Sequence, residues 1–417
     1  MPRYLRPILL ASSVLTLSCT KSPSEPQGLP AAVTALPRTL TQAESGLRDA
    51  ANAFSFALWN RVNGTQRDSN VFLSPLSATF ALGMTLNGAA GPTYDEMRAA
   101  LQLSGLSEAE VNSGYKSLLA LLTSLDATVE MRVANSIWYR QTFAFHQSFL
   151  DAGRTYFDAE IAGLDFTNAA ASLATINGWV SAHTNGRIPS IIDEIRDEHV
   201  MFLINAIYFN GSWRERFDPA ETRDDTFRSS DGATQPARLM HRRDTISYAE
   251  SPAWQAVDLP YGNTAFTMTV VLPREGTDIE TLAGSFDATT WNALTAALEQ
   301  QQVDLLLPKV KLSYERTLND DLKALGMQRA FIGNVADFTR MSPAGDQLYI
   351  DFVKQKTFVD IHEEGTEAAA ATAVGVGVTS APLVYDVRVD RPYLIVLRER
   401  LSGTIVFMGK IARMPED

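Results

Sequence analysis

Residues able to do acid–base, nucleophilic or metal chemistry are few in this chain of 417 residues, which has five histidines and one cysteine. The histidines are spread along the chain without the spacing of a metal site: they are His146, His183, His199, His241 and His362. The chain contains no G-x-S-x-G, Walker, H-E-x-x-H or C-x-x-C motif. A Ser/His/Asp triad assembled across the fold would leave no such pattern. We expect a protein that is not an enzyme and uses no cofactor or metal.

One local grouping could support acid–base chemistry, because Glu363 and Glu364 follow His362 directly. Adjacent residues on a strand point to opposite faces, so the three side chains would not converge on one substrate. We therefore favour a solvated charged edge over a catalytic group.

The stretch from Glu363 to Ser380 is unusual because, after Gly365, it consists almost entirely of small uncharged residues without proline. Four consecutive alanines favour a helix, whereas alternating valines and glycines disfavour one. Period-two spacing puts a small, uncharged set on one face: Thr366, Ala368, Ala370, Thr372, Val374 and Val376. Glu367 falls on the other face. The pattern predicts a mobile loop able to become a central strand, and the alternative is a small-residue linker.

Composition and charge narrow the possible partners. The hydrophobic content of 45% and charged content of 20% are typical of a globular protein. The net charge is −12 and the pI is about 5.0, and no basic patch offsets this acidity. The chain therefore has no feature that favours nucleic-acid binding.

The first 18 residues have the pattern of an export signal. Arg3 and Arg6 precede the apolar run 8–17, which is too short to span a bilayer, and Ser18 is a small residue before the cut. Cys19 lies where a bacterial lipoprotein would carry its lipid, although Thr16 replaces the usual aliphatic residue. We expect an exported protein, either a cell-envelope lipoprotein or an extracellular protein with an ordinary cleaved signal.

The segment that follows, residues 19–43, is rich in proline, serine and threonine and is predicted to be a flexible tether. Cys19 is the only cysteine, so the mature chain has no internal disulfide despite its export signal. No linker interrupts residues 44–417, which we predict to form one domain.

The elements expected to position these residues differ between the two halves of that domain. The first half has helical spacing over several segments, with Ser74-Pro75 and a capping box at Ser107 as start signals: 47–58, 75–87, 115–125 and 172–183. It also has the strands 71–73 and 132–139. The second half has short apolar strands: 200–209, 265–272, 303–307, 393–397 and 404–408. Helices are predicted there at 287–301 and 318–325. This order predicts an α+β fold with one large sheet covered on both faces.

Several motifs in order then resemble those of serpins, the serine-protease inhibitors that act by loop insertion. From about residue 46 to the end, the matching segments are Asn70-Val71-Phe72-Leu73-Ser74-Pro75-Leu76-Ser77, Asn205 to Trp213, Leu259-Pro260-Tyr261, Leu307-Pro308-Lys309, Ala336-Asp337-Phe338, Arg391-Pro392-Tyr393 and Phe407-Met408-Gly409-Lys410. The resemblance implies three β-sheets, about nine helices and an exposed reactive-centre loop. It also implies a target serine protease as partner, and we expect the inhibitor to be a monomer.

Within the loop, the resemblance assigns a hinge, which would enter the sheet first, followed by a bait segment, which contains the bond that the protease attacks. The hinge comprises Glu363, Glu364, Gly365, Thr366, Glu367, Ala368, Ala369, Ala370 and Ala371. Counting seventeen residues from Glu363, as in the family, puts the reactive bond between Thr379 and Ser380. Counting back from Pro392 puts it at Ala381 instead, and we favour the first count.

The size and charge of the residues in the hinge and bait indicate that the protein is an inhibitor, and they also indicate which class of protease it inhibits. Small inward residues permit insertion, whereas a buried charge or a proline would oppose it. No arginine or lysine lies between Ala368 and Tyr385, which argues against trypsin-like targets. Val378, Thr379 and Ala381 suit a small apolar pocket, as in elastase-like or subtilisin-like proteases. The alternative is a non-inhibitory serpin acting as a binding or carrier protein.

The resemblance also assigns two places where the sheet would open. Ser74, Ser77 and Asn205 match the shutter, and Trp213 and Lys309 match the breach, where Lys309 is expected to pair with Glu363. Gln355 stands where the family usually has a shutter histidine. Its amide can donate to and accept from Asn205 but cannot become charged, so the shutter is expected to be insensitive to pH.

Overall fold

The strands described below belong to a computed structural model that describes residues 30–366 and 383–415. The predicted signal peptide, Cys19 and the first part of the tether lie outside these residues. So do Glu367, Ala368, Ala369, Ala370, Ala371, Thr379, Ser380 and Ala381. Within the described ranges, no helix is both long and apolar enough to cross a membrane.

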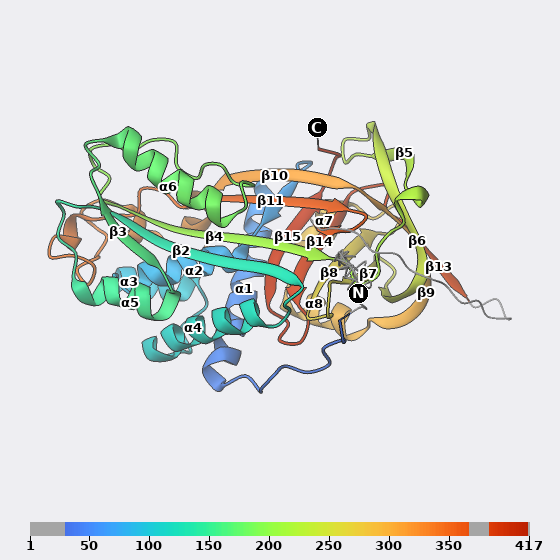
Figure 1. Ribbon diagram of the computed structural model, residues 1–417, viewed down its shortest axis with the longest axis horizontal. Coiled ribbons are helices and arrows are strands. Elements are labelled where there is room, and N and C mark those ends of the chain that lie inside the picture. The colour runs from blue at the N-terminus through green and yellow to red at the C-terminus, as the bar shows by residue number, and fades with distance from the viewer. Residues whose placement is uncertain (1–29, 367–382, 416–417) are drawn as a thin grey trace, which may run out of the picture.

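The smaller of two sheets lies along the long axis of the molecule (Figure 1). Its six described strands have the order β10-β11-β12-β4-β2-β3, and only β2 and β3 run parallel to each other. They are β2 (Val129–Arg140), β3 (Glu160–Leu164), β4 (Met201–Ser212), β10 (Val310–Thr317), β11 (Lys354–His362) and β12 (Gly365–Thr366). The two-residue strand β12 therefore separates the long strands β11 and β4.

The larger sheet has nine described strands and contains most of the apolar runs of the second half. Its path is β1-β15-β14-β8-β7-β6-β9-β13, and β5 also pairs with β6. They are β1 (Val71–Leu73), β5 (Arg223–Arg228), β6 (Thr234–Glu250), β7 (Trp254–Pro260), β8 (Phe266–Pro273), β9 (Glu299–Pro308), β13 (Val384–Arg388), β14 (Tyr393–Glu399) and β15 (Ile405–Ile411). The long strand β6 pairs with β5 and β9 over most of its length and with β7 at its end. Two of the three expected sheets are thus joined through β6 into one hydrogen-bonded sheet.

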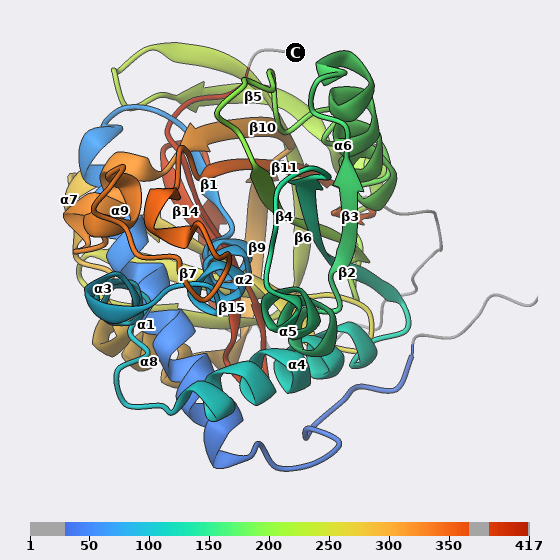
Figure 2. The ribbon, with the colours of Figure 1, turned by 90° about the vertical axis from the view of Figure 1, so that its left-hand side faces the viewer.

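Nine α-helices occur in the described residues, which confirms the α+β class. They are α1 (Gln42–Thr65), α2 (Pro75–Leu86), α3 (Gly91–Ala100), α4 (Glu108–Ser124), α5 (Gln147–Phe157), α6 (Ala169–His183), α7 (Ile279–Gly284), α8 (Ala288–Ala296) and α9 (Asn319–Ala324). Helix α2 lies near the centre, packed against both β4 and β15, while α6 lies outside the smaller sheet (Figure 2). A separate apolar cluster that includes Trp179, Ile192 and Phe202 fills the space under α6.

Local signals explain where several of these helices begin and end. Ser74 accepts a hydrogen bond from the N–H of Ser77, and Pro75 occupies the first helical position of α2, as predicted. The predicted capping box at Ser107 is present at α4. The helix predicted over 287–301 is too long, because α8 ends at Ala296 and Glu299 already begins β9. The end of α8 is set by the pairing of β9 with β6, which is a contact between residues far apart in the sequence.

The described part of the predicted tether does not behave as a free coil. The N–H of Val33 donates to the carbonyl of Asn263 at 2.7 Å, and Arg214 donates to the carbonyl of Pro30 at 2.9 Å. Thr41 forms a capping box with Glu44, so α1 begins at Gln42, inside the segment assigned to the tether. Pro30 and Val33 are therefore attached to the folded body through hydrogen bonds of their main-chain groups, which composition does not reveal.

Candidate functional site

The candidate site begins at β12, where the first residues of the predicted hinge already form part of the sheet. Thr366 pairs with Gly211 of β4 and Ile361 of β11 and is only 5% exposed. Its hydroxyl lies 2.7 Å from the hydroxyl of Tyr261. Gly365 has a φ of 157°, and a Cβ there would approach the carbonyl oxygen of Gly211 to 2.2 Å. Glycine is therefore required where the chain turns into the sheet.

The breach residues surround this turn. Trp213 is buried, stacks on Tyr261 with ring centroids 4.5 Å apart, and donates its indole N–H to the carbonyl of His362 at 2.9 Å. Its own backbone N–H donates to the carbonyl of Glu364 at 2.9 Å. These contacts attach the end of β4 to the chain segment leading into β12. The alternative, in which Trp213 only fills the core, does not account for the bond to His362.

The expected ion pair between Lys309 and Glu363 is present, with Nζ 2.7 Å from Oε2. Thr222 donates to the other carboxylate oxygen at 2.8 Å. Burial alone would raise the pKa of Glu363, but these hydrogen bonds and the backbone outweigh it and lower the pKa below its ordinary value. The solvated charged edge is therefore wrong for Glu363, whose buried carboxylate lies between Lys309, directly after β9, and Thr222, directly before β5.

Replacement of Glu363 by glutamine should weaken the fold at neutral pH and have less effect in acid. The carboxylate is stabilised in the folded state, so its contribution is complete above its ordinary pKa and is lost as pH falls through the lowered value. We expect Glu363→Gln to reduce the free energy of unfolding by about 1–2 kcal/mol at pH 7, and by progressively less below about pH 4. Urea unfolding of both proteins across this range measures the difference. Glu364→Gln is the control, and an equal effect at all pH values would contradict the prediction.

The shutter residues lie on either side of the space between β4 and β11, further from β12, and form two separate hydrogen-bonded groups. On the β4 side, Ser77 donates to Asn205, and Asn205 donates to Asn135 of β2 at 2.6 Å. On the β11 side, the Gln355 amide oxygen accepts from the N–H of Ser74 at 3.0 Å, and its nitrogen donates to the Ser74 carbonyl at 2.7 Å. Each group fastens one side of the opening to α2 or to its cap.

The expectation that Gln355 contacts Asn205 is wrong. Both polar atoms of the Gln355 amide are used by the main chain of Ser74, and no hydrogen bond among the described residues joins Gln355 to Asn205. The physical reason is that the two strands carrying these residues are not paired here. Sequence reasoning also missed Asn135 and Thr222, and it gave Tyr261 no role beyond its place in a matching motif. Asn135 could have been noticed as a buried amide in an apolar strand, whereas Thr222 gives no signal.

Below β12 the strands β4 and β11 form no ladder with each other in the described residues: β4 pairs with β12 and β2, and β11 pairs with β10 and β12. A cavity of about 170 Å³ lies between their first residues. Its wall includes Ser77, Ala78 and Leu82 of α2, Asn205 of β4 and Gln355 of β11. Two neighbouring strands therefore present main-chain groups toward an opening that can accept a further strand.

Comparison with known proteins is consistent with this geometry. The family model described as "Serpin (serine protease inhibitor)" matches residues 49–414. A serpin-like protein of Thermococcus kodakarensis is 32% identical over 381 residues, covering 90% of this chain and 87% of the relative. Neuroserpin of Gallus gallus is 32% identical over 368 residues, covering 86% and 89%.

Solved structures share the same fold. The thermophilic serpin tengpin in its native state has a TM-score of 0.80 and 28% identity, with 92% of this chain and 98% of that chain covered. Human thyroxine-binding globulin in complex with thyroxine has a TM-score of 0.82 and 26% identity, with 90% and 100% covered.

Proposed function

The chain belongs to the serpin family of serine protease inhibitors, and we propose that it traps its target by taking its cleaved loop into the smaller sheet between β4 and β11. The observation that carries this proposal is the placement of Thr366 between the two strands, with no ladder joining them beyond it. The hinge would thus already occupy the first position of the strand to be added.

The proposed reaction begins as ordinary proteolysis. The serine hydroxyl of the protease attacks the loop carbonyl, the peptide C–N bond breaks, and the leaving amine takes a proton. The remaining ester joins protease and inhibitor. The part of the loop before the cut then enters the opening and carries the protease with it, before water can hydrolyse the ester.

Insertion is favourable because it completes the sheet. About ten further ladder hydrogen bonds, each contributing about 1 kcal/mol net, would form with the facing edges of β4 and β11. Burial of small side chains over α2 adds to this gain. The uncut chain is then a kinetically trapped state that persists because β4 and β11, although not paired with each other, have to move further apart before more of the loop can enter.

The bait sequence supports targets that prefer small apolar residues, the elastase-like or subtilisin-like proteases. The candidate residues Val378, Thr379 and Ala381 are small and uncharged, and no basic residue lies nearby. The reactive bond is proposed between Thr379 and Ser380, with Ala381 as the alternative.

The test is to mix the protein with an elastase-like or a subtilisin-like protease and examine the products by gel electrophoresis in SDS. We expect a complex that survives boiling, with a mass equal to the protease plus the loop-cleaved chain. Mass spectrometry of the released C-terminal peptide identifies the bond that was cut. Cleavage of the loop by both enzymes without any stable complex would contradict the proposal.

A second candidate is a non-inhibitory binding or carrier function. It is favoured by the likeness to thyroxine-binding globulin, whose solved structure contains thyroxine. Under this candidate the loop is cut without a stable complex, and cleavage does not raise the melting temperature.

A further inference from the structure

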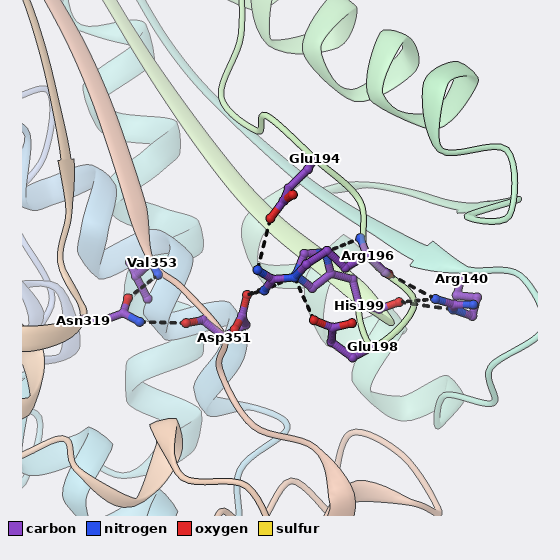
Figure 3. Close-up of polar contacts among 8 residues, drawn as sticks. All are labelled: Arg140, Glu194, Arg196, Glu198, His199, Asn319, Asp351 and Val353. Atoms are coloured by element: carbon purple, nitrogen blue, oxygen red, sulfur yellow. Dashed lines mark hydrogen bonds and ion pairs between the residues drawn. The ribbon is translucent and has the colours of Figure 1, made fainter.

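The far end of the opening, where β4 and β11 begin, is bridged by charged side chains (Figure 3). Arg196 and His199 belong to the segment that links α6 to β4, and both contact Asp351, which lies just before β11. The distance between His199 Nε2 and Asp351 Oδ2 is 3.0 Å. We call Arg196, His199 and Asp351 the clasp. It joins the two sides of the opening at the end furthest from β12.

A second ion pair crosses at the same end. Lys354, the first residue of β11, lies 2.5 Å from the carboxylate of Asp193 in the linking segment. Ile191 and Ile192 of that segment line the cavity. The segment from 191 to 199 is thus tied to β11 by charged contacts while its apolar residues cover the opening.

The clasp is held rigidly on the β4 side. The ring of His199 is buried, and its Nδ1 accepts the backbone N–H of Arg196 at 3.1 Å, which leaves Nε2 to donate to Asp351. Arg196 also pairs with Glu194 and Glu198. Behind them, Arg140 of β2 donates to the carbonyl of His199 at 2.8 Å (Figure 3).

The β11 side is fastened equally well. The side-chain nitrogen of Asn319 in α9 donates to the carbonyl of Asp351 at 2.7 Å, and its oxygen accepts the N–H of Val353 at 2.8 Å. Both ends of the clasp are therefore attached to secondary structure. Parting β4 from β11 at this end requires the Asp351 contacts to break, because neither side can follow the other.

The pairing register relates the clasp to loop insertion. Continuing the partners of Thr366, which are Gly211 on β4 and Ile361 on β11, sets residue 376 opposite Asp351 and residue 378 opposite His199. A strand that ends before residue 374 would stop short of the clasp. A strand long enough to reach the predicted reactive bond would have to pass between its two halves.

We propose that the clasp sets the rate of the last stage of insertion, so that Asp351 decides how quickly a strand can fill the far end of the opening. This inference rests on the proposed loop insertion. It adds that the barrier lies in a particular charged contact at the far end of the opening, beyond the shutter residues of the same cavity and away from the breach.

Synthetic peptides test this without a protease. One peptide has the sequence of residues 367–378 and reaches the clasp, and a shorter one has the sequence of residues 367–373 and does not. Each is incubated with the intact protein, and incorporation is followed over hours by native gel and melting temperature. For Asp351→Asn we expect incorporation of the longer peptide to be about three- to tenfold faster than in the wild type, because a charge-assisted contact is lost at a partly exposed site.

The shorter peptide provides the internal control, and its rate should be the same in both proteins. Asp320→Asn, an exposed acid next to Asn319 in α9, should change neither rate. If Asp351→Asn does not fold, Asp193→Asn removes the second crossing from an exposed position and is expected to speed the longer peptide in the same way. Raised ionic strength should accelerate the longer peptide more in the wild type than in Asp351→Asn, because salt screens exposed charges and only the crossing Asp193–Lys354 pair remains to be screened in the variant.

The outcomes distinguish failure of the proposed loop insertion from failure of the proposed role of the clasp. If neither peptide enters the wild-type protein, the opening does not accept a strand, and loop insertion and the clasp both fail. If the wild type accepts both peptides but Asp351→Asn takes up the longer one at the same rate, the clasp alone is refuted. Equal acceleration of both peptides would also refute it, because that result indicates a general loss of stability.

Discussion

Replacement of Thr366 by arginine is expected to abolish trapping of the protease while the loop is still cut. Thr366 is almost fully buried between β4 and β11, and its hydroxyl bonds to Tyr261, beside the stacked ring of Trp213. A guanidinium at this position would be buried without a partner, which costs several kcal/mol. The arginine would therefore keep the hinge out of the sheet, and the acyl-enzyme would be hydrolysed before insertion.

The measurement is the fraction of protease found in the SDS-stable complex at equal loop cleavage. We expect Thr366→Arg to lower it by more than about tenfold, because each 1.4 kcal/mol changes a rate by that factor. Thr123→Arg in the last turn of α4 is a matched control, since Thr123 is exposed and a cation is tolerated at a helix C-terminus. An undiminished yield from Thr366→Arg would show that trapping does not require the hinge to enter the sheet.

The largest expected loss of stability comes from Glu280→Gln. Lys410 of β15 is completely buried, and its Nζ lies 2.5 Å from Glu280 of α7 and 3.1 Å from the carbonyl of Gln66. Burial lowers the pKa of the Lys410 ammonium, and the neighbouring carboxylate partly opposes this. Removal of the carboxylate charge leaves a buried cation unpaired, which should reduce the free energy of unfolding by about 3–5 kcal/mol.

Urea unfolding measures this effect, and two further variants test its cause. Glu280→Gln combined with Lys410→Met should regain part of the loss, because no charge then remains in the core. Asp151→Asn removes an exposed pair with Arg154 and should change the stability by less than about 0.5 kcal/mol. A double variant no more stable than Glu280→Gln alone would mean that packing, not the unpaired charge, causes the loss.

The sequence by itself determined the features that depend on neighbouring residues. Ser74 and Pro75 begin α2, the Ser107 capping box begins α4, and apolar runs became strands of the larger sheet, because caps, turns and side-chain periodicity act over a few residues. The family was also evident from the sequence, since its motifs occur in order. The Lys309–Glu363 pair followed from that resemblance, not from local chemistry.

Only the tertiary structure decided which sides of the opening are joined and which are free. Gln355 pairs with the main chain of Ser74 instead of Asn205 because β11 and β4 are separated below Thr366. The spacing of the five histidines in the sequence predicted no functional role, yet His199 contacts Asp351, which lies 152 residues away in the sequence. Contacts of this kind depend on strand register and on how far two strands stand apart. Those quantities are set by packing over the whole sheet and leave no local pattern.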